Sequence, residues 1–303
     1  MNKNEFKKLK IFVGLYAVLL ICFTVYVMLD TFVIQHTYVQ VQERKEAAEP
    51  AGDAGQGAVV TDTTYQDADI SIELKEYRQY ETQIYVADVT VGDASFLRTA
   101  LAGNVFGRNI KDSTSRIAAD HNAILAVNGD YYGAQRDGYV IRGGTLYRSD
   151  SREGDQEDLV ISKDGSLGSI REGDITAEEL VEQGAEEVLS FGPALIREGK
   201  IAVGEEDEVG KAMASNPRTV VAQLAPLHYL FVVSDGRTSE SEGLSLHQMA
   251  EFLQGLQVDF AYNLDGGGSS TMVFNGQVVN KPTTRGRKIE ERGVSDIVYI
   301  GAE

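Results

Sequence analysis

The hydrophobic pattern begins with one long apolar run. Residues 11–29 read IFVGLYAVLLICFTVYVML without a charge. In a helix these residues span about 28 Å, close to the hydrocarbon thickness of a bilayer. Four lysines precede the run, which keeps the N-terminus in the cytoplasm by the positive-inside rule. A cleaved signal peptide would need a shorter apolar core and a small-residue cleavage site, and Met28-Leu29-Asp30 offers neither. The pattern predicts a cytoplasmic segment 1–10, an uncleaved transmembrane signal anchor 11–29, and an extracytoplasmic main domain on a single-pass cell-membrane protein.

The next segment separates this helix from the folded part of the chain. Residues 31–42 are mixed apolar and could extend the helix as a stalk, whereas residues 43–66 are small, polar and rich in glycine, as in flexible linkers. We therefore expect a stalk and linker over 30–66 and one folded domain over 67–303.

Short segments in which apolar and polar residues alternate dominate residues 67–303. Ile70, Ile72 and Leu74 alternate with polar residues, and residues 84–89 form a second strand-like run. Tight-turn pairs recur between apolar runs, at residues 143–144, 164–165, 198–199 and 275–276. Two capping boxes, at Thr176 and Ser245, predict helices, and a third helix ends near residue 121. These signals predict an α+β fold, with a mainly antiparallel sheet and a few packed helices, preceded by a single transmembrane helix.

Composition narrows the function. The 303-residue chain is 43% hydrophobic and has a formal charge of −18; residues 1–29 carry +3, which leaves −21 for the remainder. Such an acidic body argues against general nucleic-acid binding, which needs Lys and Arg to meet phosphates. The only cysteine, Cys22, lies in the apolar run, and there are four histidines. This excludes an internal disulfide framework and makes a Cys/His zinc site a poor fit.

The segment with the strongest chemical signal is 261–272, AYNLDGGGSSTM. A strand leads to Asp265, three glycines follow (Gly266, Gly267, Gly268), and then three hydroxyl residues (Ser269, Ser270, Thr271). Glycines let a ligand approach main-chain N–H groups, which can form an anion-binding nest. The segment is neither a Walker loop, since no Lys follows, nor a dinucleotide fingerprint, since a hairpin follows rather than a helix. A simple tight turn is the alternative.

Three further loops carry polar groups at strand ends. Residues 126–133 offer Asn128, Asp130 and Tyr131, which suit sugar hydroxyls and a sugar face; Arg218 follows Pro217 at a strand start, where its guanidinium suits a phosphate. Asp235 and Arg237 end another strand. For each loop the alternative is structural: an Asn-Gly turn, a surface Arg and an Asp-Gly turn.

Taken in order, these segments resemble the phosphodiester glycosidase family. The residues that carry the resemblance are AVNGDYYG (126–133), FGPALIREGKI (191–201), NPRTVVA (216–222), VSDGR (233–237), GLSLHQMAEFLQGL (243–256), NLDGGGSSTM (263–272), VVNKP (278–282) and RGVSD (292–296). The match covers roughly residues 67–300, and NLDGGGSSTM is its most specific part. One departure is that the family often has Asn-Gly-Gly-Phe-Phe where this chain has residues 128–132, NGDYY.

The resemblance implies hydrolysis of the bond between a sugar anomeric carbon and a phosphodiester. Phosphate is a good leaving group, so stabilising its charge matters more than a strong general acid. Arg218 and the glycine N–H groups suit that role, and Asp265, or else Asp130, suits the carboxylate at the sugar centre. A local positive field would come from arginines; the candidates are Arg116, Arg142, Arg218, Arg237 and Arg285.

The expected partners are therefore an anionic glycan or sugar phosphate of the cell wall or exopolysaccharide and, through the helix, the membrane. A bound metal stays an alternative: Asp130, Asp235 and Asp265 would bind a divalent cation only if they converge. Two other functions remain: a non-catalytic glycan-binding module in exopolysaccharide or cell-wall assembly, and a peptidoglycan or ester hydrolase with Ser269 or Ser270 as nucleophile.

Overall fold

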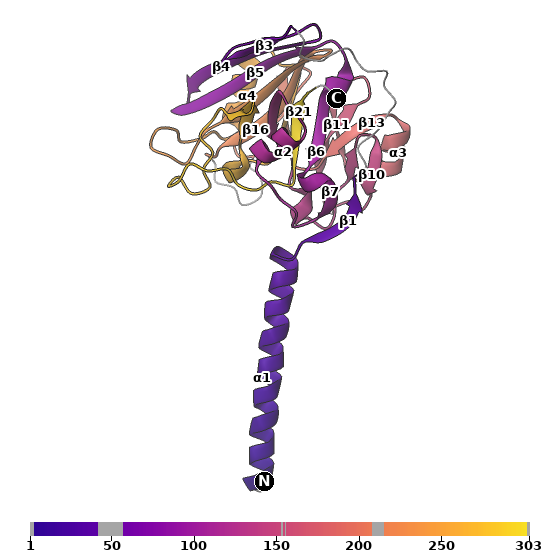
Figure 1. Cartoon of the computed structure of the whole chain (residues 1–303), viewed down its shortest axis with the longest axis vertical. Coiled ribbons are helices and arrows are strands. Elements are labelled where there is room, and N and C mark those ends of the chain that lie inside the picture. Colours follow the sequence, from indigo (N-terminus) through magenta and orange to yellow (C-terminus); the bar gives the residue numbers. More distant parts are fainter. Residues whose placement is uncertain (1–2, 42–56, 153, 155, 208–214, 302–303) are drawn as a thin grey trace.

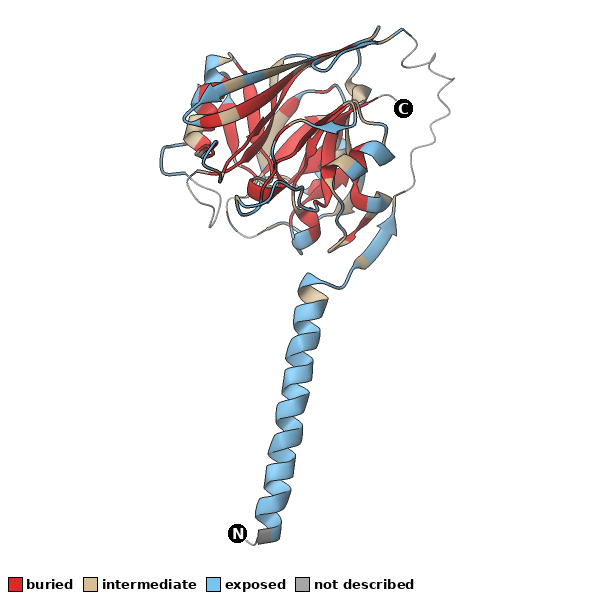
Figure 2. Cartoon of the chain, turned by 60° about the vertical axis from the view of Figure 1, so that its left-hand side comes forward, coloured by how far each residue is buried: buried red, intermediate tan, exposed pale blue. Residues whose placement is uncertain are grey.

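A long N-terminal helix projects from a β-rich domain in the computed structural model (Figure 1). The structure describes residues 3–41, 57–152, 154, 156–207 and 215–301. Helix α1 (Lys3–Phe32) contains the predicted span and exceeds it at both ends. The most apolar stretch of 18 residues in this helix has a mean hydropathy of 2.5, and none of that stretch is buried (Figure 2). By length and composition this helix is able to cross a membrane.

The segment after the helix differs from the predicted stalk. The helix ends at Phe32, and residues 36–40 form strand β1 (His36–Gln40), which pairs with β7 (Val105–Arg108) of the domain. Most of the predicted linker, residues 42–56, lies outside the described residues. Its last part is ordered, because β2 (Val59–Val60) and β3 (Thr64–Gln66) join the largest sheet. The folded region thus begins before residue 67.

The largest sheet has nine strands in the order β15-β14-β18-β16-β17-β5-β4-β3-β2. Its remaining members are β4 (Ile70–Gln79), β5 (Thr82–Val91), β14 (Ala194–Arg197), β15 (Lys200–Ile201), β16 (Arg218–Ala225), β17 (His228–Ser234) and β18 (Phe260–Asn263). All its pairings are antiparallel.

Two five-stranded sheets and the two-stranded pair β1-β7 complete the fold. The first, β20-β19-β8-β21-β6, comprises β6 (Leu97–Leu101), β8 (Leu125–Asn128), β19 (Met272–Phe274), β20 (Gln277–Val278) and β21 (Asp296–Ile300). The second, β10-β9-β13-β11-β12, comprises β9 (Val140–Arg142), β10 (Thr145–Arg148), β11 (Glu157–Ser162), β12 (Leu167–Arg171) and β13 (Ala185–Leu189).

Few helices accompany the sheets. The α-helices of the domain are α2 (Thr114–Asp120), α3 (Ala177–Glu182) and α4 (Leu246–Gly255), and the 3-10 turns are η1 (Ala94–Phe96), η2 (Ala102–Asn104), η3 (Tyr132–Ala134) and η4 (Gly267–Ser269). Both predicted capping boxes are present, at Thr176 and Ser245. The predicted α+β fold with mainly antiparallel sheets is confirmed.

Alternation along the strands gives the large sheet two buried faces. In β17, Tyr229, Phe231 and Val233 pack into the main core between the sheets. Leu230 and Val232 point to the opposite face, where α4 covers them. Because both faces are buried, residues 229–233 read as one continuous apolar run rather than an alternating one. The strand ends that carry the polar loops are held between these layers.

Candidate active site

The triple-glycine segment forms a tight bend directly after β18. Gly267 has φ of +63°, and a Cβ on Gly266 would lie 2.8 Å from the Pro217 carbonyl oxygen, so both positions require glycine. The amide of Gly267 donates to that same oxygen over 2.8 Å, and the amide of Ser269 donates to Gly266. These two N–H groups already donate hydrogen bonds to carbonyl oxygens within the protein. The predicted anion nest is therefore only partly available, and charge on the surrounding side chains becomes more important.

Asp265 sits at the open edge of this bend. Its Oδ2 accepts hydrogen bonds from Ser269 Oγ (2.6 Å) and Arg292 Nη2 (2.9 Å), and its side chain is 16% exposed. Burial raises the pKa of Asp265, while the charge of Arg292 and the Ser269 hydrogen bond act in the opposite direction. The carboxylate is thus fixed in orientation but still accessible.

Arg292 is a site residue that the sequence-based candidates do not include. Its Nε donates to Ser269 Oγ over 2.9 Å, its Nη2 reaches Asp265, and its side chain is 43% exposed. The sequence signal that points to Arg292 is the RGVSD motif at 292–296. This motif supports the family resemblance, but the sequence analysis gives its arginine no role. Only the folded chain brings this arginine to a carboxylate 27 residues away.

Arg237 lies against the other side of the bend. Its Nη2 is 2.7 Å from the point that a Cβ on Gly267 would occupy, so glycine makes room for the guanidinium. Asn216 Oδ1 accepts from Arg237 Nε and Nη2 (3.1 and 2.8 Å), and the Thr284 carbonyl accepts from Nη1 (2.6 Å). Burial lowers the pKa of Arg237, and the positive charges of Arg292 and Arg218 lower it further. Arg237 is therefore close enough to Arg292 and to Arg218 to be repelled by both charges.

Arg218 supports the bend from within the protein. It begins β16, and its Cα lies 3.9 Å from the Cβ position of Gly266. The residue is only 3% exposed, and its Nε donates to the Leu244 carbonyl over 2.8 Å. The backbone of this arginine lies beside the triple-glycine bend, while its Nε is bonded to the Leu244 carbonyl.

Two of the predicted contact residues are buried and act through their neighbours. Asn128 is inaccessible; its Nδ2 donates to the Asp265 carbonyl (2.6 Å), and its Oδ1 accepts from Thr219 Oγ1 (2.8 Å). Asp130 is also buried, where it pairs with Arg142 and accepts the amide of Ser190. Neither side chain reaches the surface, so the geometry assigns them positioning roles rather than substrate contact.

Asp235 likewise holds a loop instead of facing solvent. It is 4% exposed, and its Oδ1 accepts from the Lys281 amide (2.8 Å) and Asn280 Nδ2 (3.2 Å). These bonds fix the start of residues 281–293, which we call the strap. The strap passes the bend at Thr284, whose Oγ1 lies beside Gly268, and Arg292 is its second-last residue. Asp235 thus positions the strap.

The remaining predicted residues divide between the bend and the surface. Ser269, Ser270 and Thr271 are buried in the bend, and only Ser269 bonds to Asp265. Tyr131 is half-buried and lies edge-on to Phe191, with the Arg152 guanidinium over its ring at 5.3 Å. Of the other arginine candidates, Arg116 pairs with Asp120 on α2 and Arg142 is buried with Asp130, whereas Arg285 lies exposed on the strap, next to Thr284.

The arrangement gives no support to a serine nucleophile or a metal centre. Described contacts of the histidines lie elsewhere, with Asp30 for His36, Tyr299 for His121, Asp88 for His228 and Val203 for His247. Within the described ranges, no three His, Cys, Asp or Glu side chains gather into a possible metal site. Asp130, Asp235 and Asp265 each have different partners and do not converge.

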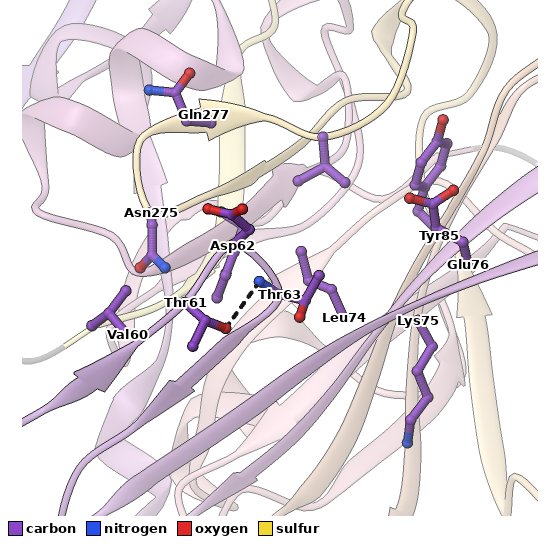
Figure 3. A pocket seen from close by; sticks show the side chains of 12 residues that line it. Val60, Thr61, Asp62, Thr63, Leu74, Lys75, Glu76, Tyr85, Asn275 and Gln277 are labelled. Atoms are coloured by element: carbon purple, nitrogen blue, oxygen red, sulfur yellow. Dashed lines mark hydrogen bonds between the residues drawn. The ribbon is translucent and has the colours of Figure 1, made fainter.

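A separate cavity of about 560 Å³ lies between the β2–β3 turn and the β19–β20 hairpin (Figure 3). Asp62 and Glu76 line it, with Lys75 as its basic residue, and none of the three arginines does. Two carboxylates against one ammonium do not favour a phosphate. The cluster around Asp265 is therefore the better candidate for anion chemistry.

Comparisons with known proteins identify one family. The model of the phosphodiester glycosidase family matches residues 121–301. Human N-acetylglucosamine-1-phosphodiester alpha-N-acetylglucosaminidase is 28% identical over 198 residues, which cover 63% of this chain and 34% of that protein. The SPbeta prophage-derived uncharacterized protein YomE of Bacillus subtilis is 23% identical over 235 residues, covering 73% of this chain and 36% of that protein. The chain thus spans about a third of the length of these relatives.

A solved structure has the same fold. It is the catalytic domain of the zebrafish N-acetylglucosamine-1-phosphodiester alpha-N-acetylglucosaminidase, auto-inhibited by its pro-peptide. The TM-score is 0.60 at 21% identity, over 78% of this chain and 83% of that chain.

Proposed function

This chain belongs to the phosphodiester glycosidase family, and we propose that it hydrolyses the bond between a sugar anomeric carbon and a phosphodiester. The observation that carries the proposal is the convergence of one accessible carboxylate and three arginines on a single glycine bend. Asp265 and Arg292 lie at the open edge, Arg237 flanks Gly267, and Arg218 lies behind Gly266. In a protein of net charge −18, such a local positive cluster favours an anionic substrate.

The proposed reaction breaks the C1–O bond of the sugar. The departing phosphomonoester takes the electron pair, and the arginine cluster stabilises its added negative charge. Water supplies the hydroxyl that ends on C1, and its proton passes to a base or to solvent. Because phosphate is a good leaving group, one carboxylate and a cluster of positive charges are sufficient for this reaction.

Asp265 is the carboxylate that we assign to the sugar centre. It acts in its ionised form, either by stabilising the oxocarbenium-like carbon or by activating water. Arg292 and Ser269 hold one oxygen of the carboxylate, which fixes its direction. Asp130 is inaccessible and paired with Arg142, so it is the weaker of the two candidates.

The decisive experiment is hydrolysis of a panel of UDP-sugars and sugar-1-phosphodiesters by the full chain in detergent. We expect sugar release by wild type, its near-complete loss in Asp265→Asn, and unchanged release in Asp120→Asn, an exposed carboxylate on α2 that pairs with Arg116. Absence of release by wild type across the panel, with tight glycan binding by calorimetry, would instead favour a binding module.

We also propose that the natural substrate is an anionic glycopolymer of the cell surface. Helix α1 supports a membrane-anchored protein with a cytoplasmic N-terminus and an extracytoplasmic domain. The strap adds exposed basic residues, Arg285 and Arg287, beside the site of an otherwise acidic protein. They are suitably charged to bind phosphates that neighbour the scissile one in a repeating polymer.

The polymer proposal predicts a difference between short and long substrates. Arg285→Ala with Arg287→Ala should raise the KM for a phosphodiester-linked oligomer several-fold and leave the KM for a single sugar-1-phosphodiester unchanged. The effect should shrink in high salt, since these side chains are exposed. Equal KM changes for both substrates would contradict the polymer proposal without affecting the proposed reaction.

A further inference from the structure

The end of helix α1 is fastened to the domain by polar contacts. Arg108 Nη2 donates to the Asp30 carbonyl (2.8 Å) and pairs with its carboxylate (3.3 Å). Asn109 Nδ2 donates to the carbonyls of Thr31 (3.1 Å) and Ile34 (3.0 Å). We call Arg108 and Asn109 the clamp. It satisfies carbonyls at the helix C-terminus that have no partner within the helix.

A second attachment follows immediately. Strand β1 pairs with β7 from His36 opposite Arg108 to Gln40 opposite Val105. The Tyr38 ring lies 5.9 Å from that of Phe106, which is buried in the domain. The chain between helix and domain is therefore ordered by pairing and packing, and the orientation of the helix is coupled to that of the domain.

Four apolar side chains of this attachment are exposed, beside the exposed polar residues Gln35, Thr37 and Gln40. Val33, Ile34, Tyr38 and Val39 are 63%, 39%, 59% and 46% exposed, although they adjoin an ordered domain. Figures 1 and 2 both show β1 at the end of the domain where α1 joins it. We call these four residues the juxtamembrane face. If the hydrocarbon region ends near residue 29, this face begins at the level of the outer headgroups.

We propose that the juxtamembrane face rests in the headgroup region of the lipid bilayer and that the clamp holds the domain in one orientation on the membrane. The inference depends on the membrane anchoring proposed above and goes beyond it, since an anchor alone would leave the domain free to tumble. Tyrosine with small aliphatic residues suits the interface, where one end of the ring is apolar and the other is wet. The partner is lipid because the face is continuous with the helix that enters the bilayer.

The test uses the absence of tryptophan from the sequence. Single-tryptophan variants Tyr38→Trp, Lys111→Trp and Tyr80→Trp of the full chain are reconstituted into phosphatidylcholine vesicles with or without a nitroxide on the lipid headgroup. Lys111 is exposed and lies two residues beyond the clamp, and Tyr80 is 41% exposed in the turn between β4 and β5. Figure 1 shows β4 and β5 on the side of the domain away from α1. We expect roughly twofold quenching at positions 38 and 111 and little at position 80.

A clamp variant separates orientation from mere tethering. In an Arg108→Ala/Asn109→Ala background, quenching of Lys111→Trp should fall to the level of Tyr80→Trp, while hydrolysis of a soluble substrate persists. Equal quenching at positions 111 and 80 in the intact clamp overturns the proposal, as does a dimer that shields position 38 from lipid. If the chain fails to float with vesicles, the anchoring itself is wrong; if it floats and the quenching is equal, only the docked orientation is wrong.

Discussion

Two groups of aspartate and arginine in this domain have the same chemistry and opposite surroundings. Asp265 and Arg292 are 16% and 43% exposed in their side chains. Asp130, Arg142 and Asp296 are 0%, 5% and 0% exposed, with Arg142 Nη2 bonded to both carboxylates at 3.2 and 2.6 Å. The first group can meet a substrate, and the second cannot. Burial rather than residue type therefore separates the candidate catalytic carboxylate from the structural ones.

The difference in exposure also changes how much each group contributes to the free energy of unfolding. A buried ion pair loses much of its hydration, so removing one partner leaves a charge that nothing compensates. A partly exposed pair keeps contact with water and contributes less to stability. We therefore expect changes at Asp265 and Arg292 to affect the reaction and changes in the Asp130–Arg142–Asp296 group to affect folding.

The largest effect should follow Asp265→Asn. The amide keeps the volume but removes the negative charge, so kcat should fall by about a thousandfold, as for loss of a principal catalytic group. The free energy of unfolding should change by no more than about 1 kcal/mol, because the pair with Arg292 is partly exposed. Steady-state kinetics and urea unfolding measure the two. Full activity in this variant would remove Asp265 from the mechanism.

Arg142→Met tests the buried group. It leaves Asp130 and Asp296 without their cation, and the free energy of unfolding should fall by about 3–5 kcal/mol. The exposed control Arg116→Met should change it by less than about 1 kcal/mol. Urea unfolding followed by circular dichroism measures both. Equal stability of the two variants would show that the buried group is not a structural unit.

Arg292→Ala is expected to have an intermediate effect. Loss of one charge-stabilising group should lower kcat/KM by roughly 10- to 100-fold. Because Arg292 opposes the upward shift of the Asp265 pKa, its removal should move the acid limb of the kcat/KM profile to higher pH. Arg292→Lys keeps the charge and should largely retain the wild-type limb. A limb that is identical in wild type and both variants would argue that Asp265 is not the titrating group.

The smallest effect concerns Glu187, beside the buried group. Burial raises its pKa from 4.5 to about 7. The folded state then keeps a proton that the unfolded state releases, so stability should fall as pH rises from about 4.5 to about 7. Glu187→Gln has no such proton and should largely remove this fall. Unfolding free energies at several pH values test it, and parallel curves for both proteins would contradict the assignment.

Much of the local structure follows from sequence signals that act over a few residues. The pairs at residues 143–144, 164–165, 198–199 and 275–276 all lie between paired strands, and the capping boxes at Thr176 and Ser245 begin helices. Each of these signals is a short-range preference of backbone geometry or hydrogen bonding. They could therefore be read without knowing what packs against them.

The site was harder to predict because it depends on convergence. Asp265 stands out in the sequence because three glycines are more than a turn requires, and its catalytic role stays a prediction. Asp130 and Asp235 stood in equally polar loops, and nothing local indicates that Arg142 and the strap would bury them. Arg292 precedes β21 and contacts a carboxylate 27 residues away, and β1 pairs with a strand about 70 residues away. Such contacts are set by the whole topology.

The hydrogen bonds of Asn128 have a consequence for how this protein should lose activity on heating. Its single carboxamide joins β8 of a five-stranded sheet, Thr219 on the nine-stranded sheet, and the carbonyl of Asp265. A slight slip between those layers would break this junction while every strand stayed intact. Catalytic function should then disappear at a temperature below the main melting transition, and cooling should restore it.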